Sequence, residues 1–139
     1  MRSLTSNDIT AVCAIDALSF APYEQYNSAF YRELAESHGY EAIVATIPDG
    51  TIVGWILADI VRSPVRIRSI SVHPEYRRKG FGYALLTEIL SAHSEVDLLV
   101  EPDNVHALRL YQRLGFVITD GDPEMPERIR MLWTRCGDI

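Results

Sequence analysis

The amino-acid sequence predicts an α/β protein in which a central mixed sheet of about six to seven strands is flanked by about four helices. β-rich apolar runs and helical patterns alternate along the chain, and at least one strand–helix–strand segment requires a crossover connection. Apolar residues make up 47% and charged residues 23% of the 139 positions, a composition typical of a soluble globular protein with one core. We therefore expect a single domain over residues 1–139.

The N-terminal segment predicts a short strand and two helices. The strand-like MRSL precedes a capping box from Thr5 to Asp8, which opens a helix that runs to about Phe20. Pro22 interrupts that helix because it has no backbone N–H group to donate. A second helix is expected over Tyr26–Ser37, and a glycine that can serve as its C-cap follows.

Three strands are expected in the middle of the chain. The runs YEAIVATI and TIVGWILADIV have strand composition, and Pro48-Asp49-Gly50 between them is a hairpin signal. VRIRSISV predicts a third strand, which His73-Pro74 ends.

The C-terminal half predicts two helices and three strands. A helix runs from near Lys79 to about Ala92, and VDLLV follows as a short buried strand. Asn104 opens the next helix. Its apolar positions recur at i, i+3, i+4 and i+7, which places them on one face: Ala107, Leu110, Tyr111 and Leu114. A glycine ends this helix, and FVITD and RIRMLW are the last two strands.

Composition and charge narrow the classes of function. No run reaches the roughly 18 apolar residues of a membrane helix, and no secretory signal is visible. Two distant cysteines, Cys13 and Cys136, fit a reducing compartment better than a disulfide framework. The net charge of −6 argues against nucleic acid as the main partner. We expect a cytoplasmic protein that binds neither nucleic acid nor a membrane.

A cationic glycine turn is the main functional signal. Three cations, Arg77 to Lys79, stand directly before Gly80-Phe81-Gly82 at the start of a predicted helix. Unpaired backbone N–H groups and the helix dipole favour an anion such as phosphate at such a place, and glycine allows close approach of the backbone. Alternatively, the glycines only start the helix and the cations are solvated.

Other familiar motifs do not fit the sequence. A dinucleotide-binding GxGxxG motif needs glycine or alanine at the position of Leu85 and a strand directly before it, and the P-loop pattern GxxxxGK[ST] does not occur. No catalytic serine or cysteine pattern stands out. No metal is expected, because the histidines lack ligand spacing: His38, His73, His93 and His106.

Two motifs, in the correct order, resemble the GNAT superfamily of N-acetyltransferases. VHPEYRRKGFG matches its motif A, [R/Q]-x-x-G-x-[G/A], which follows a strand ending in Val-x-Pro. NVHALRLYQRLGF matches its motif B, Asn-x-x-Ala-x-x-Leu-Tyr-x-x-x-Gly-Phe. The predicted order of elements is also that of the superfamily, so the resemblance covers nearly the whole chain. It implies a GNAT-like fold with a splay between the RSISV and VDLLV strands.

The resemblance implies acetyl-CoA as the co-substrate. Its pyrophosphate would lie on the backbone amides of residues 78–83, and its pantetheine arm would pair with the end of the preceding strand. The residues implied to bind it are Ile70, Ser71, Val72, Arg77, Arg78, Lys79, Gly80, Phe81, Gly82, Tyr83 and Asn104.

The resemblance also assigns Tyr111 as the general acid. A phenol with an ordinary pKa of about 10 can protonate the departing thiolate. Motif B is most similar to the branch that acetylates the N-termini of ribosomal proteins. That branch carries a glutamate base where this chain has Leu99. Glu101, on the same strand face, and a base acting through ordered water are alternatives, and weaker candidates are Glu24, His73 and His106. The base stays open.

Arg66 and Arg68 stand where other relatives place a glutamate, and their spacing puts them on one face of a strand. They are either solvated or paired with Asp59 and neighbouring acids, or they recognise a substrate carboxylate. The acidic net charge points instead to a cationic amine.

The sequence thus predicts an acetyl-CoA-dependent N-acetyltransferase that acts on a primary amine, either a peptide N-terminus or a small molecule. Transfer of another acyl group is the second enzymatic interpretation. A coenzyme-binding sensor or partner domain with little turnover is the alternative outside catalysis. RIRMLW is expected to present a sheet edge, through which a homodimer could form.

Overall fold

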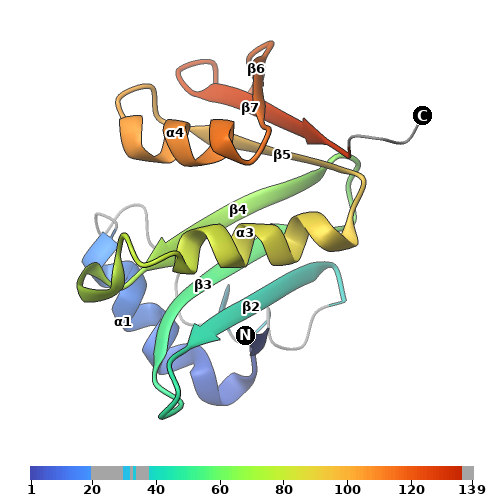
Figure 1. Ribbon diagram of the computed structural model, residues 1–139. Coiled ribbons are helices and arrows are strands. Elements are labelled where there is room, and N and C mark those ends of the chain that lie inside the picture. Colours follow the sequence, from blue (N-terminus) through green and yellow to red (C-terminus); the bar gives the residue numbers. More distant parts are fainter. Residues whose placement is uncertain (20–29, 32, 34–37, 136–139) are drawn as a thin grey trace.

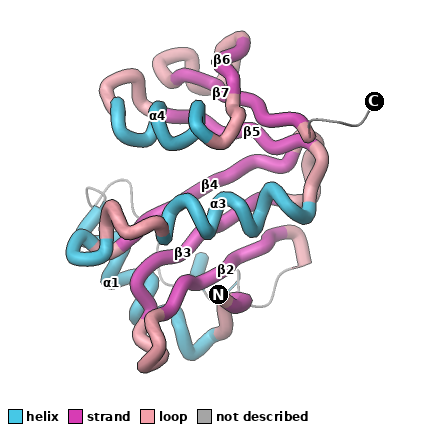
Figure 2. The backbone as a smooth tube through the Cα atoms, viewed as in Figure 1, coloured by secondary structure: helices cyan, strands magenta, loops and turns pink. Residues whose placement is uncertain are grey.

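One seven-stranded mixed sheet organises the chain (Figure 1, Figure 2). The computed structural model describes residues 1–19, 30–31, 33 and 38–135. The strand order is β1-β2-β3-β4-β5-β7-β6, with β4 and β5 parallel. The strands are β1 (Arg2–Ser3), β2 (Tyr40–Thr46), β3 (Ile52–Asp59), β4 (Val65–Val72), β5 (Glu95–Val100), β6 (Val117–Thr119) and β7 (Ile129–Thr134). The α-helices are α1 (Ile9–Ser19), α3 (Phe81–Ala92) and α4 (Val105–Arg113), and the short 3-10 helices are η1 (Ser6–Asp8) and η3 (Pro74–Tyr76). The predicted α/β class is confirmed.

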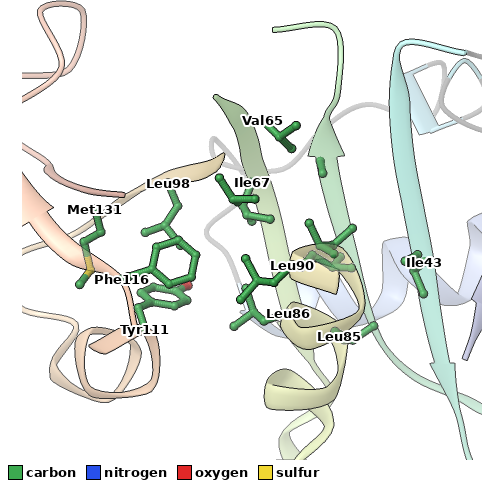
Figure 3. Packing of buried hydrophobic residues seen from close by; sticks show 14 of the residues in the cluster. Ile43, Val65, Ile67, Leu85, Leu86, Leu90, Leu98, Tyr111, Phe116 and Met131 are labelled. Atoms are coloured by element: carbon green, nitrogen blue, oxygen red, sulfur yellow. The ribbon is translucent and has the colours of Figure 1, made fainter. Parts of the chain in front are cut away.

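Alternate residues of the inner strands point into two separate cores. On one face, Trp55 and Leu57 of β3 join a cluster that also contains Val12 of α1. On the other face, Ile56 joins a larger cluster to which α3 and α4 contribute, and Figure 3 shows α3 side chains such as Leu86 in it. The side-chain period of two in a strand produces this division. Burial of one such side chain contributes about 1.5–3 kcal/mol, so both helical layers are firmly held to the sheet.

The predicted capping box and hairpin both form. The Thr5 amide donates to Asp8 Oδ2 at 2.8 Å. Arg2 donates to the same carboxylate at 2.7 Å and thereby lowers the pKa of Asp8 to about 2, against the opposing effect of burial. Between β2 and β3, Gly50 has a φ of +93° and donates its amide to Ile47 O at 2.8 Å. Glycine suits this turn because it adopts positive φ without a steric penalty.

One predicted helix lies largely outside the described residues, and another begins later than expected. The helix expected over Tyr26–Ser37 lies largely outside the described residues, as does the boundary at Pro22. The helix expected from near Lys79 begins at Phe81, because Gly80 at its N-cap has a φ of +90°, which is not helical. Within the described residues, no helix is both long and apolar enough to cross a membrane.

The expectation that RIRMLW forms an exposed edge is wrong. β7 pairs with β5 on one side and with β6 on the other, so both of its edges are bonded. The edge on this side of the sheet is β6, where Val117 and Ile118 are exposed. The residues of RIRMLW alone do not show that the preceding short strand β6 pairs with β7 and takes the edge position. The predicted homodimer therefore has no support from this strand.

Candidate functional site

The carboxyl ends of β4 and β5 separate in the middle of the sheet, as Figure 1 shows. The two parallel strands pair only over Val65–Ile67 and Val96–Leu98. Beyond that point, Ser69–Val72 pairs with β3, and no other described strand adjoins its second edge. The predicted splay is thus confirmed. Ligands of α/β sheets bind outside the carboxyl ends of strands, which makes this gap the first place to look for a site.

The amino end of α3 adjoins the gap, because a short loop joins it directly to the end of β4. Arg78 and Gly80 in that loop have φ values of +63° and +90°. The Ala84 amide donates to Gly80 O at 3.0 Å and makes the first helical bond. The amides of residues 81–83 precede it and have no acceptor within the helix, and the glycine N-cap has no side chain to offer them. Together with the helix dipole, these amides form an anion-binding end.

The three cations before the glycines lie in the loop that leads to this end of the helix. All three are exposed. Arg77 Nε donates to Val72 O at 3.0 Å, which ties the loop to the end of β4. Lys79 Nζ lies 5.4 Å from the centre of the Tyr76 ring, a cation–π contact. Their positive charge is therefore held close to the helix end in a chain that is acidic as a whole.

Most of the other residues predicted to bind a coenzyme use their side chains elsewhere. Ile70 and Phe81 pack against the larger core cluster. Ser71 is buried and donates its hydroxyl to Asp16 at 2.8 Å. Tyr83, in contrast, is 45% exposed. These positions can therefore meet a ligand mainly through their backbone groups.

Gly82 faces α4 across the first turn of α3. A Cβ atom built on it would lie 3.7 Å from Leu110 Cδ2, an ordinary contact, and its φ is not positive. Glycine is therefore not required here by the backbone. A side chain larger than that of alanine would extend toward Leu110 on α4.

Tyr111 lies on the inner face of α4 and is 8% exposed. Its ring centre is 5.8 Å from that of Phe116, and Figure 3 shows the phenol oxygen on the side that faces Leu86. No described residue forms a hydrogen bond with this hydroxyl. Burial raises the pKa of Tyr111 to about 12, so the phenol keeps its proton at neutral pH. The predicted amphipathic face is confirmed, because Ala107, Leu110 and Leu114 also pack against the core.

Asn104 caps α4. Its side-chain oxygen accepts from the Ala107 amide at 3.2 Å, and the residue is exposed. The cap explains why an asparagine suits this position. Among the described residues its amide nitrogen has no hydrogen-bond partner, so it can donate to a ligand.

The candidates for a base have different surroundings. Leu99 is half-buried on β5. Glu101 is 3.1 Å from Arg128 Nε, and its side chain is 49% exposed. His73 accepts the Glu75 amide at Nδ1, at 3.1 Å, and so caps η3. A further candidate, His106, is exposed on α4, whereas Glu24 lies outside the described residues.

The two arginines of β4 are held by acids. Arg66 is 4% exposed and donates to Asp97 at 2.6 and 2.9 Å, and also to Asp122 at 3.3 Å. Burial tends to raise the pKa of Asp97, but the hydrogen bonds and charges of Arg66 and then Arg130 outweigh it and hold this pKa below its usual value. Arg68 pairs with Asp59 at 3.2 Å, as one sequence interpretation expected. The buried, fully engaged Arg66 guanidinium is unsuited to the alternative, recognition of a substrate carboxylate.

Sequence reasoning also missed the buried carboxyl group of Asp16 on α1. It is 1% exposed. Tyr31 donates to one of its oxygens, and Trp55 and Ser71 donate to the other at 2.8 Å each. The available signal was its position four residues after the apolar Val12, which places an acid on the buried face of the helix.

Among the described residues, no group of three or more His, Cys, Asp or Glu side chains could hold a metal ion. Cys13 is a free thiol, whereas Cys136 lies outside the described residues.

Comparison with known proteins assigns the chain to a family. Residues 11–116 match the acetyltransferase (GNAT) family. The N-alpha-acetyltransferase RimI of Mycobacterium tuberculosis is 33% identical over 121 residues, which cover 82% of this chain and 75% of that protein. The mycothiol acetyltransferase of Clavibacter sepedonicus is 32% identical over 129 residues, but the match covers 84% of this chain and only 42% of that protein.

Solved structures show the same fold. Arabidopsis thaliana NAA60 in complex with acetyl-CoA superimposes with a TM-score of 0.79 at 20% identity, and the match covers 98% of each chain. The family match spans both the cationic glycine turn and the helix that carries Tyr111. The chain belongs to the GNAT family of acetyltransferases.

Proposed function

We propose that this protein transfers an acetyl group from acetyl-CoA to a primary amine, by direct attack of the amine in a ternary complex. One observation carries the proposal: a helix end with unbonded amides adjoins the gap between the separated ends of β4 and β5. The gap offers an unpaired strand edge, and the helix end offers an anion site. Family membership and the acetyl-CoA complex of NAA60, which has the same fold, support the choice of co-substrate.

The coenzyme would extend from the amino end of α3, where its phosphates bind, into the gap between β4 and β5, where its thioester lies. Its pyrophosphate would accept hydrogen bonds from the amides of residues 78–83, with the cations Arg77 to Lys79 around it. Its pantetheine arm would pair with the free edge of Ile70–Val72 like an added strand. Gly82 leaves room for it beside α4, and the Asn104 amide nitrogen would add one contact.

Tyr111 would act as the general acid. The neutral amine attacks the thioester carbonyl, the carbon–sulfur bond breaks, and the phenol gives its proton to the departing thiolate sulfur. A pKa raised to about 12 suits this role, because the group stays protonated until the thiolate forms. The proton lost by the amine would leave through ordered water. Water is the better-supported base because Leu99 occupies the expected position and Glu101 is paired with Arg128.

The acceptor is a peptide N-terminus or a small-molecule amine. Similarity to an N-alpha-acetyltransferase favours the peptide, whereas similarity to a mycothiol acetyltransferase supports a small-molecule acceptor. The second candidate function is a coenzyme-binding sensor with little turnover. The leucine at the expected position of the base favours it.

Calorimetric titration with acetyl-CoA tests the coenzyme site. Wild type is expected to bind, and Gly82→Trp is expected not to, because its indole would fill the space beside Leu110. Gly121→Trp is the matched control, since nothing lies within 4 Å of a Cβ at that loop position. If Gly82→Trp, once shown to be folded, binds as well as wild type, the proposed path is wrong. Turnover with a panel of peptides and small amines then separates enzyme from sensor.

A further inference from the structure

The carboxyl-terminal half of β4, whose second edge has no neighbouring strand among the described residues, is held by a hydrogen bond to α1 on one face of the sheet. Arg66 and Ile67 pair with both β3 and β5, but Ser69–Val72 pairs with β3 alone among the described strands. The side chain of Ser71 points away from the larger core, is 6% exposed, and donates to Asp16 Oδ1 at 2.8 Å. This hydrogen bond connects the half of β4 that has only one neighbouring strand to α1, a helix on the opposite face of the sheet from α3.

Asp16 gathers donors from three separate segments. Trp55 on β3 donates to the same oxygen that Ser71 uses, and these two donors are cross-strand neighbours in register. Tyr31 donates to the other oxygen. Within the described residues no arginine, lysine or histidine forms an ion pair with Asp16. Its only compensation there is three neutral donors in a buried position, where such hydrogen bonds are strong and directional.

We propose that Asp16 is a positioning residue that holds Ser71, and with it the coenzyme-binding edge of β4, in place. The inference rests on the proposed function, since it assigns the purpose of the restraint to the binding of acetyl-CoA. A strand edge that must accept an incoming pantetheine cannot be stabilised by a permanent neighbour. A side-chain hydrogen bond on the covered face fixes the backbone and leaves that edge open.

The competing explanation is that Asp16 only joins α1 to the sheet. The two donors to its Oδ1 atom allow the explanations to be separated, because one comes from the coenzyme strand and the other from β3. Ser71→Ala removes the first hydrogen bond and Trp55→Phe removes the second. Both lose a donor to the same buried acceptor, and both should lower the melting temperature. A positioning role predicts that Ser71→Ala also weakens acetyl-CoA binding.

The experiment measures the Kd for acetyl-CoA, and the KM for coenzyme and for amine separately, in folded variants. Ser71→Ala is expected to raise the coenzyme Kd about three- to tenfold, the size of effect that the loss of one ordinary hydrogen bond can have. The KM for the amine should stay near that of wild type. Trp55→Phe should leave the coenzyme Kd unchanged.

Variants of Asp16 test the same link from the other side. Asp16→Asn keeps an oxygen for Ser71 and Trp55, and its nitrogen can donate to the Tyr31 hydroxyl, so it should retain the wild-type Kd. Asp16→Ala should weaken coenzyme binding as Ser71→Ala does, and the double variant should be no weaker than either. If Asp16→Ala does not fold, Ser71→Ala and Asp16→Asn still decide the question.

Equal coenzyme Kd values for wild type, Ser71→Ala and Trp55→Phe would overturn the inference and leave Asp16 a structural tie alone. That result would spare the proposed function, since wild type would still bind acetyl-CoA. Failure of wild type to bind would instead reject the proposed function, and the positioning role with it.

Discussion

The two ends of the β4–β5 pair are built in opposite ways. At the amino end, Arg66 and Asp97 lie side by side in register and join the strands through a buried ion pair, which Arg130 of β7 extends. At the carboxyl end the strands diverge, and hydrogen bonds to β3 and to Asp16 hold β4. The amino ends of the two strands are joined by an ion pair, which we call the closed end, whereas the carboxyl ends are separated, which we call the open end.

The difference indicates that the closed end stabilises the sheet and that the open end provides the binding site. A parallel pair that is bonded along its full length has no room for a ligand between its strands. Closing one end firmly allows the other end to remain unpaired without loss of the fold. The four predictions below test this division, from the largest expected effect to the smallest.

Removal of Asp97 should break the closed end. Asp97→Ala leaves Arg66 buried without its main partner, and loss of one member of a buried ion pair costs about 3–5 kcal/mol of unfolding free energy. Urea denaturation measures it. The matched control is Asp59→Ala, whose partner Arg68 is 40% exposed, and it should cost no more than about 1 kcal/mol. Similar losses in the two variants would contradict the idea of a closed end.

Removal of the Tyr111 hydroxyl should impair chemistry at the open end. Tyr111→Phe is expected to lower kcat by about 10²–10⁴-fold, the usual contribution of a general acid, while the Kd for acetyl-CoA is retained. Steady-state kinetics and calorimetry measure the two quantities. Tyr40→Phe, on β2, which is separated from β4 by β3, serves as the control and should keep its rate. An unchanged kcat would remove Tyr111 from the mechanism, and a wild type without turnover would favour the sensor.

Alkaline pH should show how deeply Tyr111 is buried. Burial raises its pKa from 10.0 to about 12, so its contribution to stability is complete below pH 10 and is lost as the pH rises through 12. The loss attributable to this group is about 2–3 kcal/mol. Unfolding free energies of wild type and Tyr111→Phe between pH 8 and 12 isolate it, since the variant shares every other titration. Parallel pH curves would show that the phenol is more solvated than the structure indicates.

The glycine at the mouth of the open end should show the smallest effect. Gly80→Ala meets no atom within 4 Å, but it forces an alanine to a φ of +90°, which costs about 1–2 kcal/mol. The helix end should shift and weaken acetyl-CoA binding as well. Gly121→Ala, which has no positive φ and no neighbour within 4 Å, should match wild type in both measurements. Wild-type stability and affinity in Gly80→Ala would show that the turn adapts at no cost.

Prediction from the sequence succeeded wherever a short pattern carries the information. The capping box at Thr5, the hairpin at Gly50 and the apolar face around Tyr111 depend on residues within about one or two turns of each other. The glycine turn and the two family motifs are equally local. They located the helix end and Tyr111 and led to the correct family.

Prediction failed where distant segments meet. RIRMLW was assigned an edge because nothing in its own residues shows that β6 covers it. Arg66 could not be matched to its main partner Asp97, 31 residues away, nor could Asp16 be matched to Ser71, 55 residues away. Any acid in the chain could have paired with these groups until the strand order was known.

The sequence by itself thus determined the order of the elements and the residues of the glycine turn, because local hydrogen bonding and side-chain periodicity specify them. The resemblance of its two motifs to the GNAT superfamily implied the family and the splay of the sheet. Only the tertiary structure decided that a buried ion pair between Arg66 and Asp97 joins the amino ends of β4 and β5, and that Asp16 accepts a hydrogen bond from Ser71 behind the open edge. The physical reason is that a buried charge or hydroxyl is stabilised by whichever partners the fold brings within about 3 Å, and this choice is made between segments and not within them.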